Sequence, residues 1–299
     1  MKIKKIKFTI VICAILMLSL LLSSCSSEDT GAAFEGTYKQ GYTGLVIEKV
    51  KNYPPDEVYQ AEDIEFQIEL KNEGAYDLSN GHLQILGFDS KYVDIYDWEG
   101  KSFPTKGGVM EGRSVTNPVG DKENLNFEAS VWDIKVGAER QDFPYLITAT
   151  YDYSNELAVD VCIDPSEPDY EVYGGCTVGS RDYPNPMRLG GQGGPLAVTE
   201  IEEISTGTKV EFRILIENMG SSRSQAEEVT LIKSNLGQDT IDCEFRKTGD
   251  KSFEFEDEQY AELVCTKYHD ITSSYPTTLF LEYFYTYKVS KDYTLRVRS

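Results

Sequence analysis

Four aromatic side chains lie close together in the sequence, beside a stretch that is rich in glycine and proline: Tyr92, Tyr96, Trp98 and Phe103. Tyrosine and tryptophan combine a large apolar body with a polar tip, which suits them to contact with a partner molecule. Because binding residues are often carried by loops on a rigid scaffold, we expect these four side chains to form a partner-contact patch. A small satellite core beneath the same loop is the alternative, and the sequence leaves both open.

Four cysteines follow the N-terminal region: Cys162, Cys176, Cys243 and Cys265. An even number of cysteines in an exported chain indicates disulfide bonds. We expect the bridges Cys162–Cys176 and Cys243–Cys265, because these pairings close short loops. A zinc site built from Cys243, Cys265 and His269 is the alternative. Disulfides are favoured over zinc because no Cys-x-x-Cys pair is present.

Residue types that support catalysis are scarce in this chain. It contains two histidines, His82 and His269, and no Gly-x-Ser-x-Gly, His-Glu-x-x-His or phosphate-binding loop sequence. We therefore expect no catalytic residue, no metal site and no cofactor. Pairs of carboxylates could hydrolyse a glycosidic bond, but the 50 acidic residues make accidental pairs inevitable.

The charge balance excludes one class of partner. A formal net charge of −21 leaves no basic footprint for the phosphates of a nucleic acid. The excess of acid fits a solvated surface that keeps the protein soluble, or a surface that attracts a cationic partner. With 40% hydrophobic and 26% charged residues, the chain has the composition of a globular protein.

The N-terminus has the pattern of an export signal. Lysines at positions 2, 4, 5 and 7 precede an apolar run from Phe8 to Leu22, and small polar residues follow it. The sequence Leu22-Ser-Ser-Cys25 resembles a lipobox. That resemblance implies lipid attachment to Cys25 and cleavage before it, while an uncleaved signal anchor is the alternative. In either case we expect the rest of the chain to lie outside the cytoplasm, attached to a membrane.

The elements that position these residues occur twice. Residues 64–74 align with residues 210–220, and both segments alternate apolar and polar residues before ending in Asn-x-Gly. Such alternation predicts a half-buried strand. Downstream, residues 143–153 match residues 275–285, with Tyr-x-Tyr at the same offset from a proline. We expect a short polar turn and a final strand after each, at 157–163 and 292–297.

This pattern predicts an all-β fold with two tandem β-sandwiches, since no long segment of helical periodicity follows the leader. The glycines and prolines between the two copies are typical of a linker. We expect the extra residues of the first copy to lie within 97–121. The expected organisation is a signal peptide with lipobox at 1–25, a tether at 26–42, one sandwich at 43–163, a linker at 164–194 and a second sandwich at 195–299.

The turns Lys71-Asn-Glu-Gly74 and Glu217-Asn-Met-Gly220 resemble those of CARDB-type, immunoglobulin-like modules of bacterial and archaeal surface proteins. Residues 52–59, 71–76 and 190–195 are similar to stretches of uncharacterised exported proteins of small-genome archaea. The resemblance implies immunoglobulin-like sandwiches with a scaffolding or adhesive role outside the cell. It supplies no catalytic residues.

These observations predict a non-enzymatic, membrane-anchored protein of the cell surface that binds a protein or an envelope polymer, or serves as a scaffold. The alternative is an extracytoplasmic hydrolase or carbohydrate-binding protein that uses surface carboxylates and aromatic side chains.

Overall fold

The structure is a computed structural model that describes residues 38–164, 175–206, 208–256, 258–268 and 273–299. The described residues belong to one compact unit, Thr37–Ser299. All seventeen elements assigned among them are strands, which confirms the expected all-β class. The expected signal peptide and Cys25 lie outside the described residues. No helix among the described residues is long and apolar enough to cross a membrane.

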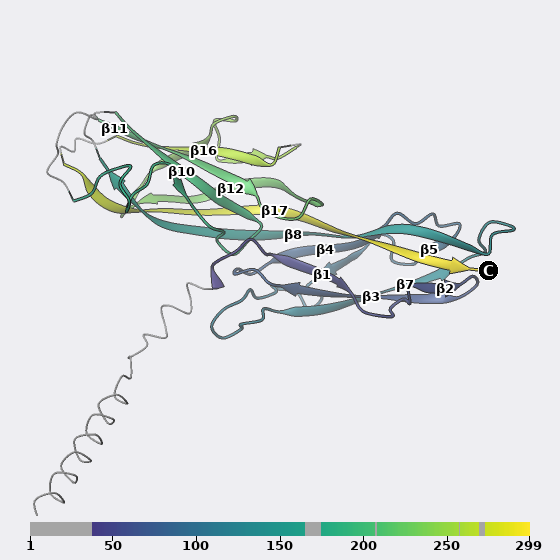
Figure 1. The fold of residues 1–299 in the computed structure, drawn as a ribbon. Coiled ribbons are helices and arrows are strands. Elements are labelled where there is room, and N and C mark those ends of the chain that lie inside the picture. The colour runs from purple at the N-terminus through teal and green to yellow at the C-terminus, as the bar shows by residue number, and fades with distance from the viewer. Residues whose placement is uncertain (1–37, 165–174, 207, 257, 269–272) are drawn as a thin grey trace, which may run out of the picture. The chain divides into compact units, whose positions relative to one another are not determined.

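Two of the three sheets are each built from one copy of the repeat, with β9 added from the connecting segment, and Figure 1 shows their arrangement. All strand pairs within these two sheets are antiparallel. The four-stranded sheet has the order β1 (Leu45–Lys49), β3 (Asp63–Asn72), β7 (Lys122–Val131) and β5 (Val93–Ile95). The five-stranded sheet has the order β14 (Asp242–Phe245), β16 (Tyr260–Tyr268), β11 (Lys209–Asn218), β10 (Leu196–Thr206) and β9 (Met187–Arg188).

The third sheet joins both copies through two long strands at its centre. Its order is β13 (Asp239–Thr240), β12 (Ser224–Leu236), β17 (Tyr275–Arg298), β8 (Arg140–Ile163), β4 (Ser79–Leu86) and β6 (Lys101–Phe103). Two short strands complete it: β15 (Ser252–Glu254) pairs with β12, and β2 (Glu57–Tyr59) pairs in parallel with the end of β17. Strands β8 and β17 have 24 residues each and pair along their whole length, from Tyr275 opposite Ile163 to Arg298 opposite Arg140.

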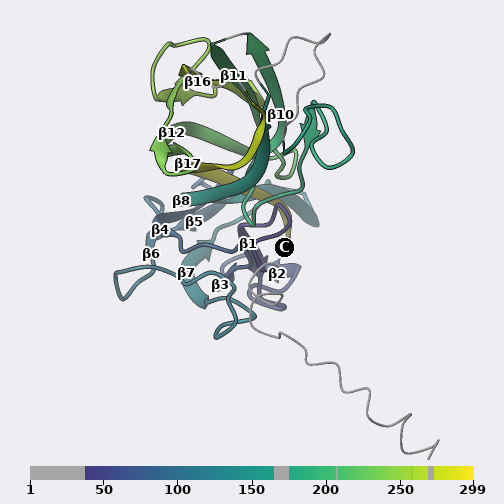
Figure 2. The same ribbon diagram turned by 90° about the vertical axis from the view of Figure 1, so that its left-hand side faces the viewer.

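Each long strand contributes side chains to both halves of one continuous hydrophobic core. We call the four-stranded sheet and the facing part of the long sheet the first lobe, and the five-stranded sheet with its facing part the second lobe. In the first lobe, Phe66 of β3 packs edge-on against Tyr145 of β8, with ring centroids 5.5 Å apart. In the second, Tyr283 of β17 donates a hydrogen bond to Leu196 O of β10 at 3.1 Å. Figure 1 shows β8 and β17 running along both groups of strands, and Figure 2, seen from one end, shows the two groups on either side of β8.

The long strands also change the expected connection between strands. The sequence predicts a polar turn near residues 154–156, but β8 continues through it to Ile163. Asn155 is fully buried there, and its amide donates to Leu196 O at 2.8 Å, so a neighbouring strand satisfies the polar group. Residues 286–298 of β17 pair with residues 140–152 of β8. In the structure, β8 of the expected first sandwich (43–163) pairs with β17 of the expected second sandwich (195–299). Independent folding of these two segments stays a prediction.

The repeated Asn-x-Gly sequence forms the same turn in both lobes. The Asn72 side chain accepts a hydrogen bond from Gly74 N, and the Asn218 side chain accepts one from Gly220 N, both at 3.1 Å. A Cβ atom on either glycine would lie 1.9 Å from a tyrosine hydroxyl of the long strands, which is Tyr153 for Gly74 and Tyr287 for Gly220. Glycine is required because the hydroxyl fills the place of a side chain.

The tyrosine contacts correct the register of the downstream repeat. Tyr151 OH accepts a hydrogen bond from Leu45 N, at the start of β1. Tyr285 takes the same place in the second lobe, where it bonds the backbone of Leu196 at the start of β10. Tyr151 therefore corresponds to Tyr285, two residues beyond the position that the sequence alignment indicates. The four tyrosines that were expected in strands are buried: Tyr151, Tyr153, Tyr283 and Tyr285. Tyr287 is buried as well.

Both expected disulfides are present. Cys162 and Cys176 have Cα atoms 5.8 Å apart, and their bridge ties the end of β8 to the segment that leads into β9. Cys243 of β14 lies directly opposite Cys265 of β16, with Cα atoms 4.0 Å apart. The two cysteines of the zinc alternative are therefore bonded to each other, and His269 lies outside the described residues.

Candidate functional site

The structure separates the four aromatic residues of the expected contact patch. Trp98 is 70% exposed and Tyr96 is 53% exposed, so both offer surface to a partner. Tyr92 is partly buried and packs against the core, with its ring centroid 5.5 Å from that of Phe143. Phe103 is only 2% exposed. Of the four residues, Tyr96 and Trp98 are therefore exposed enough to form a contact surface.

Phe103 has to be removed from the expected patch because it is part of the core. It lies on β6 opposite Gly81 of β4, and a Cβ atom on Gly81 would be 2.2 Å from its ring. Phe253 has the matching place in the second lobe, on β15 opposite Val229, and is 3% exposed. Both phenylalanines end the sequence Lys-Ser-Phe, at 101–103 and 251–253. This repeated tripeptide was the signal that identifies Phe103 as a core residue.

The extra residues of the first copy consequently lie after Phe103. Strand β6 has a counterpart in β15, so residues 97–103 belong to the repeat and residues 104–121 hold the insertion. Trp98 and Tyr96 lie before the insertion, on the connection between β5 and β6. That connection is held at its end by a hydrogen bond from Gly100 N to Asp97 O at 2.9 Å.

Tyr96 is fixed on the outer face of the four-stranded sheet. Its backbone N–H donates to Glu128 O at 3.0 Å, which extends the pairing of β5 with β7 by one residue. Its hydroxyl lies 2.6 Å from Ser130 Oγ, and Ser130 Oγ donates to Asp63 Oδ1 at 2.5 Å. Because the Ser130 proton is given to Asp63, Tyr96 is the donor to Ser130. The tyrosine ring is thus held across three strands before any partner arrives.

Carboxylates surround Tyr96 on this face. Alternation along the strands places Glu65 of β3 and Glu128 of β7 on the outer side, directly opposite each other and next to Tyr96. Two residues further along, Asp63 and Asp94 flank Ser130. We call these residues the acidic face: Asp63, Glu65, Asp94, Tyr96 and Glu128.

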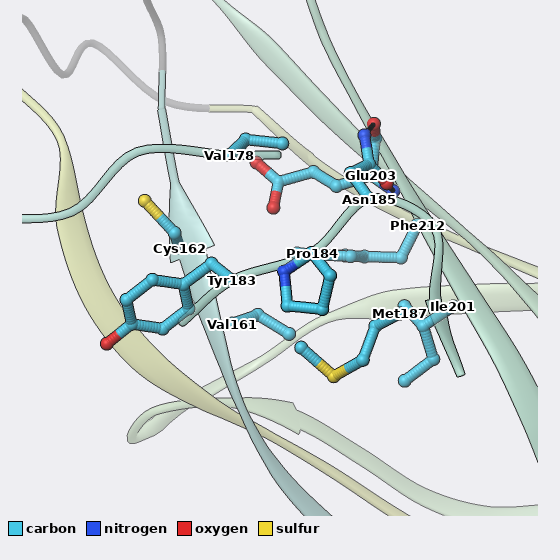
Figure 3. A pocket seen from close by; sticks show the side chains of 10 residues that line it. All are labelled: Val161, Cys162, Val178, Tyr183, Pro184, Asn185, Met187, Ile201, Glu203 and Phe212. Atoms are coloured by element: carbon cyan, nitrogen blue, oxygen red, sulfur yellow. Dashed lines mark hydrogen bonds between the residues drawn. The ribbon is translucent and has the colours of Figure 1, made fainter. Parts of the chain in front are cut away.

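A second group of interest is a carboxyl inside the second lobe, shown in Figure 3. Glu203 lies on the inner side of β10, opposite Phe212, and its side chain extends toward Val178. The surrounding cavity has a volume of about 20 Å³ and includes Tyr183 and Pro184 of the segment before β9. Asn185 of that segment is bonded to the backbone of Glu203 in both directions, at 2.8 and 2.9 Å.

Burial raises the pKa of Glu203 to about 8. This pKa includes two smaller and opposing effects of Asp164, whose backbone hydrogen bond lowers it and whose negative charge raises it. The Oε1 atom of the Glu203 carboxyl group is buried without a hydrogen-bond partner among the described residues. Glu203 therefore holds a proton at neutral pH. A cavity of this size accommodates one water molecule rather than a substrate, so its geometry suits a structural role.

Other ionisable groups add no further site. In the described part of the chain, no three histidine, cysteine, aspartate or glutamate side chains are grouped so that they could hold a metal ion. His82 lies on β4, where its Nε2 is 2.8 Å from Glu99 O, beside the turn that carries Trp98. Its place indicates a role in holding that turn.

Comparisons with known proteins leave the family open. No protein-family model and no curated protein match the chain. Among solved structures, the secreted serine protease VesC from Vibrio cholerae has 13% sequence identity and a TM-score of 0.22, over 87% of this chain and 52% of the protease. The CupB6 tip adhesin from Pseudomonas aeruginosa has 10% identity and a TM-score of 0.19, over 87% of this chain and 98% of the adhesin. This chain spans about half the length of the protease. TM-scores this low do not establish a shared fold.

Proposed function

We propose that the protein is a non-enzymatic binding or scaffolding protein of the cell surface, anchored to a membrane and built from tandem immunoglobulin-like modules of the CARDB type. The observation that carries the proposal is the pair of exposed aromatic side chains, Tyr96 and Trp98, at the edge of a rigid sheet. Tyr96 is already held by Ser130, so little side-chain entropy is lost when a partner binds.

Two observations support the proposed place of the protein outside the cytoplasm. The two disulfides fit an oxidising compartment outside the cytoplasm. The leader sequence ending in Leu22-Ser-Ser-Cys25 supports export followed by lipid attachment at Cys25. A lipid or a signal anchor then tethers the lobes to the membrane, where they face partner molecules on the outside.

The test replaces the exposed aromatics in the anchored protein. We expect that Tyr96→Ala combined with Trp98→Ala abolishes the cross-linking of surface partners in intact cells. Tyr268→Ala is the matched control, because Tyr268 is 74% exposed but lies on the second lobe. Partner capture that is unchanged in the double variant, or lost equally in the control, contradicts the proposal.

A carbohydrate-binding protein is the second candidate, and the exposed Trp98 indole next to Asp97 favours it. Indole rings offer a flat apolar surface, and carboxylates accept hydrogen bonds from hydroxyl groups. A glycan array separates the two candidates. Selective retention of one glycan that requires Trp98 supports carbohydrate binding, and turnover of that glycan supports the hydrolase alternative.

A further inference from the structure

We propose that the acidic face binds a segment of another protein that is rich in arginine or lysine. The inference rests on the proposed function, because it assigns a partner class to the surface that carries Tyr96. The face belongs to a sheet whose other side is packed in the core, and Asp63, Tyr96 and Glu128 are exposed on it.

The carboxylates of the face form two parallel rows across the sheet. One row contains Glu65, Glu128 and Tyr96, and the next contains Asp63, Ser130 and Asp94. Neighbouring strands are about 4.8 Å apart, and rows two residues apart along a strand are separated by about 7 Å. The charges are therefore spread over a flat surface and do not converge on one point. Such an arrangement fits several cationic side chains of one polypeptide better than a single metal ion.

The polar partners of these carboxylates are neutral: Asp63 accepts a hydrogen bond from Ser130 and Glu65 accepts one from Gln67, while Lys91 lines the hollow beside Asp63 without an ion pair to it. Glu65 and Glu128 are directly opposite each other, and like charges in that position destabilise a sheet. Among the described residues, no lysine or arginine forms an ion pair with the four carboxylates of the face: Asp63, Glu65, Asp94 and Glu128. An arriving cation relieves this repulsion, so the free energy of binding includes that relief.

The second lobe shows how the same position is neutralised. The repeat aligns Glu65 with Glu211, and Glu211 forms ion pairs with Lys209 at 2.8 Å and Arg213 at 3.2 Å. The pKa of Glu211 is lowered, chiefly by its hydrogen bond from Lys209. In the first lobe the residues two before and two after Glu65 are Asp63 and Gln67. Glu65 therefore accepts a hydrogen bond from the neutral amide of Gln67 at 3.3 Å, whereas Glu211 is paired with two basic side chains.

The aromatic side chains select the kind of cation. A guanidinium or ammonium group attracts the face of a tyrosine or tryptophan ring, and arginine adds a planar contact. Because Tyr96 lies beside Glu128, one arginine can stack on the ring and donate hydrogen bonds to the carboxylate. Trp98 adds exposed apolar surface close by in sequence, which favours a polypeptide with spaced basic residues over a small free cation.

The test measures binding of a deca-arginine peptide to the full chain in detergent, by fluorescence anisotropy at low and moderate salt. We expect Glu65→Gln combined with Glu128→Gln to weaken binding about tenfold or more. The matched control is Asp242→Asn combined with Glu244→Gln, which removes the same charge from exposed positions of β14 in the second lobe. A further variant, Asp63→Lys with Gln67→Arg, introduces the ion pairs of the second lobe and should abolish binding.

Equal affinity of the Glu65/Glu128 variant and the unchanged chain overturns the inference, and so does an equal loss in the control, which identifies net charge as the cause. Binding that persists in the Asp63/Gln67 variant also contradicts it. If the peptide-binding test contradicts this inference but the Tyr96/Trp98 variant still loses its surface partners, the proposed function stands. If the Glu65/Glu128 variant loses the peptide but keeps the surface partners, the acidic face binds basic segments and the aromatic side chains make a separate contact.

Discussion

Glu203 couples the stability of the second lobe to pH, because its pKa of about 8 lies above the usual value of 4.5. Between those values the folded chain keeps a proton that the unfolded chain releases. The free energy of unfolding therefore falls as the pH rises through this window. Each pKa unit corresponds to about 1.4 kcal/mol, and partial exposure of the carboxyl reduces the total to a few kcal/mol.

We therefore expect Glu203→Gln to be more stable than the unchanged chain above pH 8, and to lose most of this pH dependence. The glutamine has the shape of the acid and carries no charge at any pH. Denaturant unfolding at pH 5 and pH 8.5 measures the difference. Glu202→Gln is the matched control, since Glu202 is partly exposed on the outer side of β10, 3.7 Å from Arg213. A glutamine variant with the same pH dependence as the unchanged chain contradicts the assignment.

Phe103 and Trp98 are close in sequence but should respond oppositely to removal. We expect Phe103→Ala to lower the free energy of unfolding by about 3–5 kcal/mol, because it leaves a cavity beside Gly81. Trp98→Ala should change it by no more than about 0.5 kcal/mol, since its side chain is 70% exposed. Denaturant titration of both variants compares them, and equal losses would show that Trp98 also packs in the structure.

At the scale of the elements, local patterns in the sequence predicted the strands with one buried side. Period-two alternation placed β3 and β11 correctly, and the pairing of cysteines that close short loops predicted both bridges. The continuity of β8 through Asn155 could not be predicted in this way. A buried asparagine in a strand requires a partner distant in sequence, here Leu196 O, and a single segment carries no signal of it.

The pairing of β8 with β17 determines the result of proteolysis. Residues 177–184 lie between the first disulfide and β9 and include several exposed residues, so we expect a protease to cut there. The two products should elute together in gel filtration under native conditions, because β8 and β17 stay paired over 24 residues. Non-reducing electrophoresis in denaturant should then separate them. Products that separate without denaturant would contradict the role of these strands.

At the scale of the whole described unit, the two copies of the repeat are arranged around the centre of the long strands. Asp152 and Thr286 are corresponding residues of the repeat and also face each other across β8 and β17, joined by a hydrogen bond of 2.9 Å. Each lobe consequently uses half of β8 and half of β17. Sequence alone indicates a duplication, but it does not distinguish two adjacent copies from two copies that exchange a strand, since both have the same local patterns.

This exchange leads us to expect that the two lobes unfold together. Phe212 is fully buried in the second lobe, so Phe212→Ala should cost about 3–5 kcal/mol there. The chain contains two tryptophans, Trp98 and Trp132, and both belong to the first lobe. Tryptophan fluorescence therefore reports the lobe that does not carry the substitution.

In Phe212→Ala, the unfolding midpoint from fluorescence should fall as far as the midpoint from far-ultraviolet circular dichroism. Loss of the second lobe frees the first half of β17 and the second half of β8, and their other halves lose the continuous pairing that holds them in the first lobe. Hydrogen exchange of the β3 and β7 amides gives an independent measure and should accelerate in the same variant. A fluorescence midpoint that stays at its original value, with an earlier separate step in circular dichroism, would show that the lobes fold as independent domains.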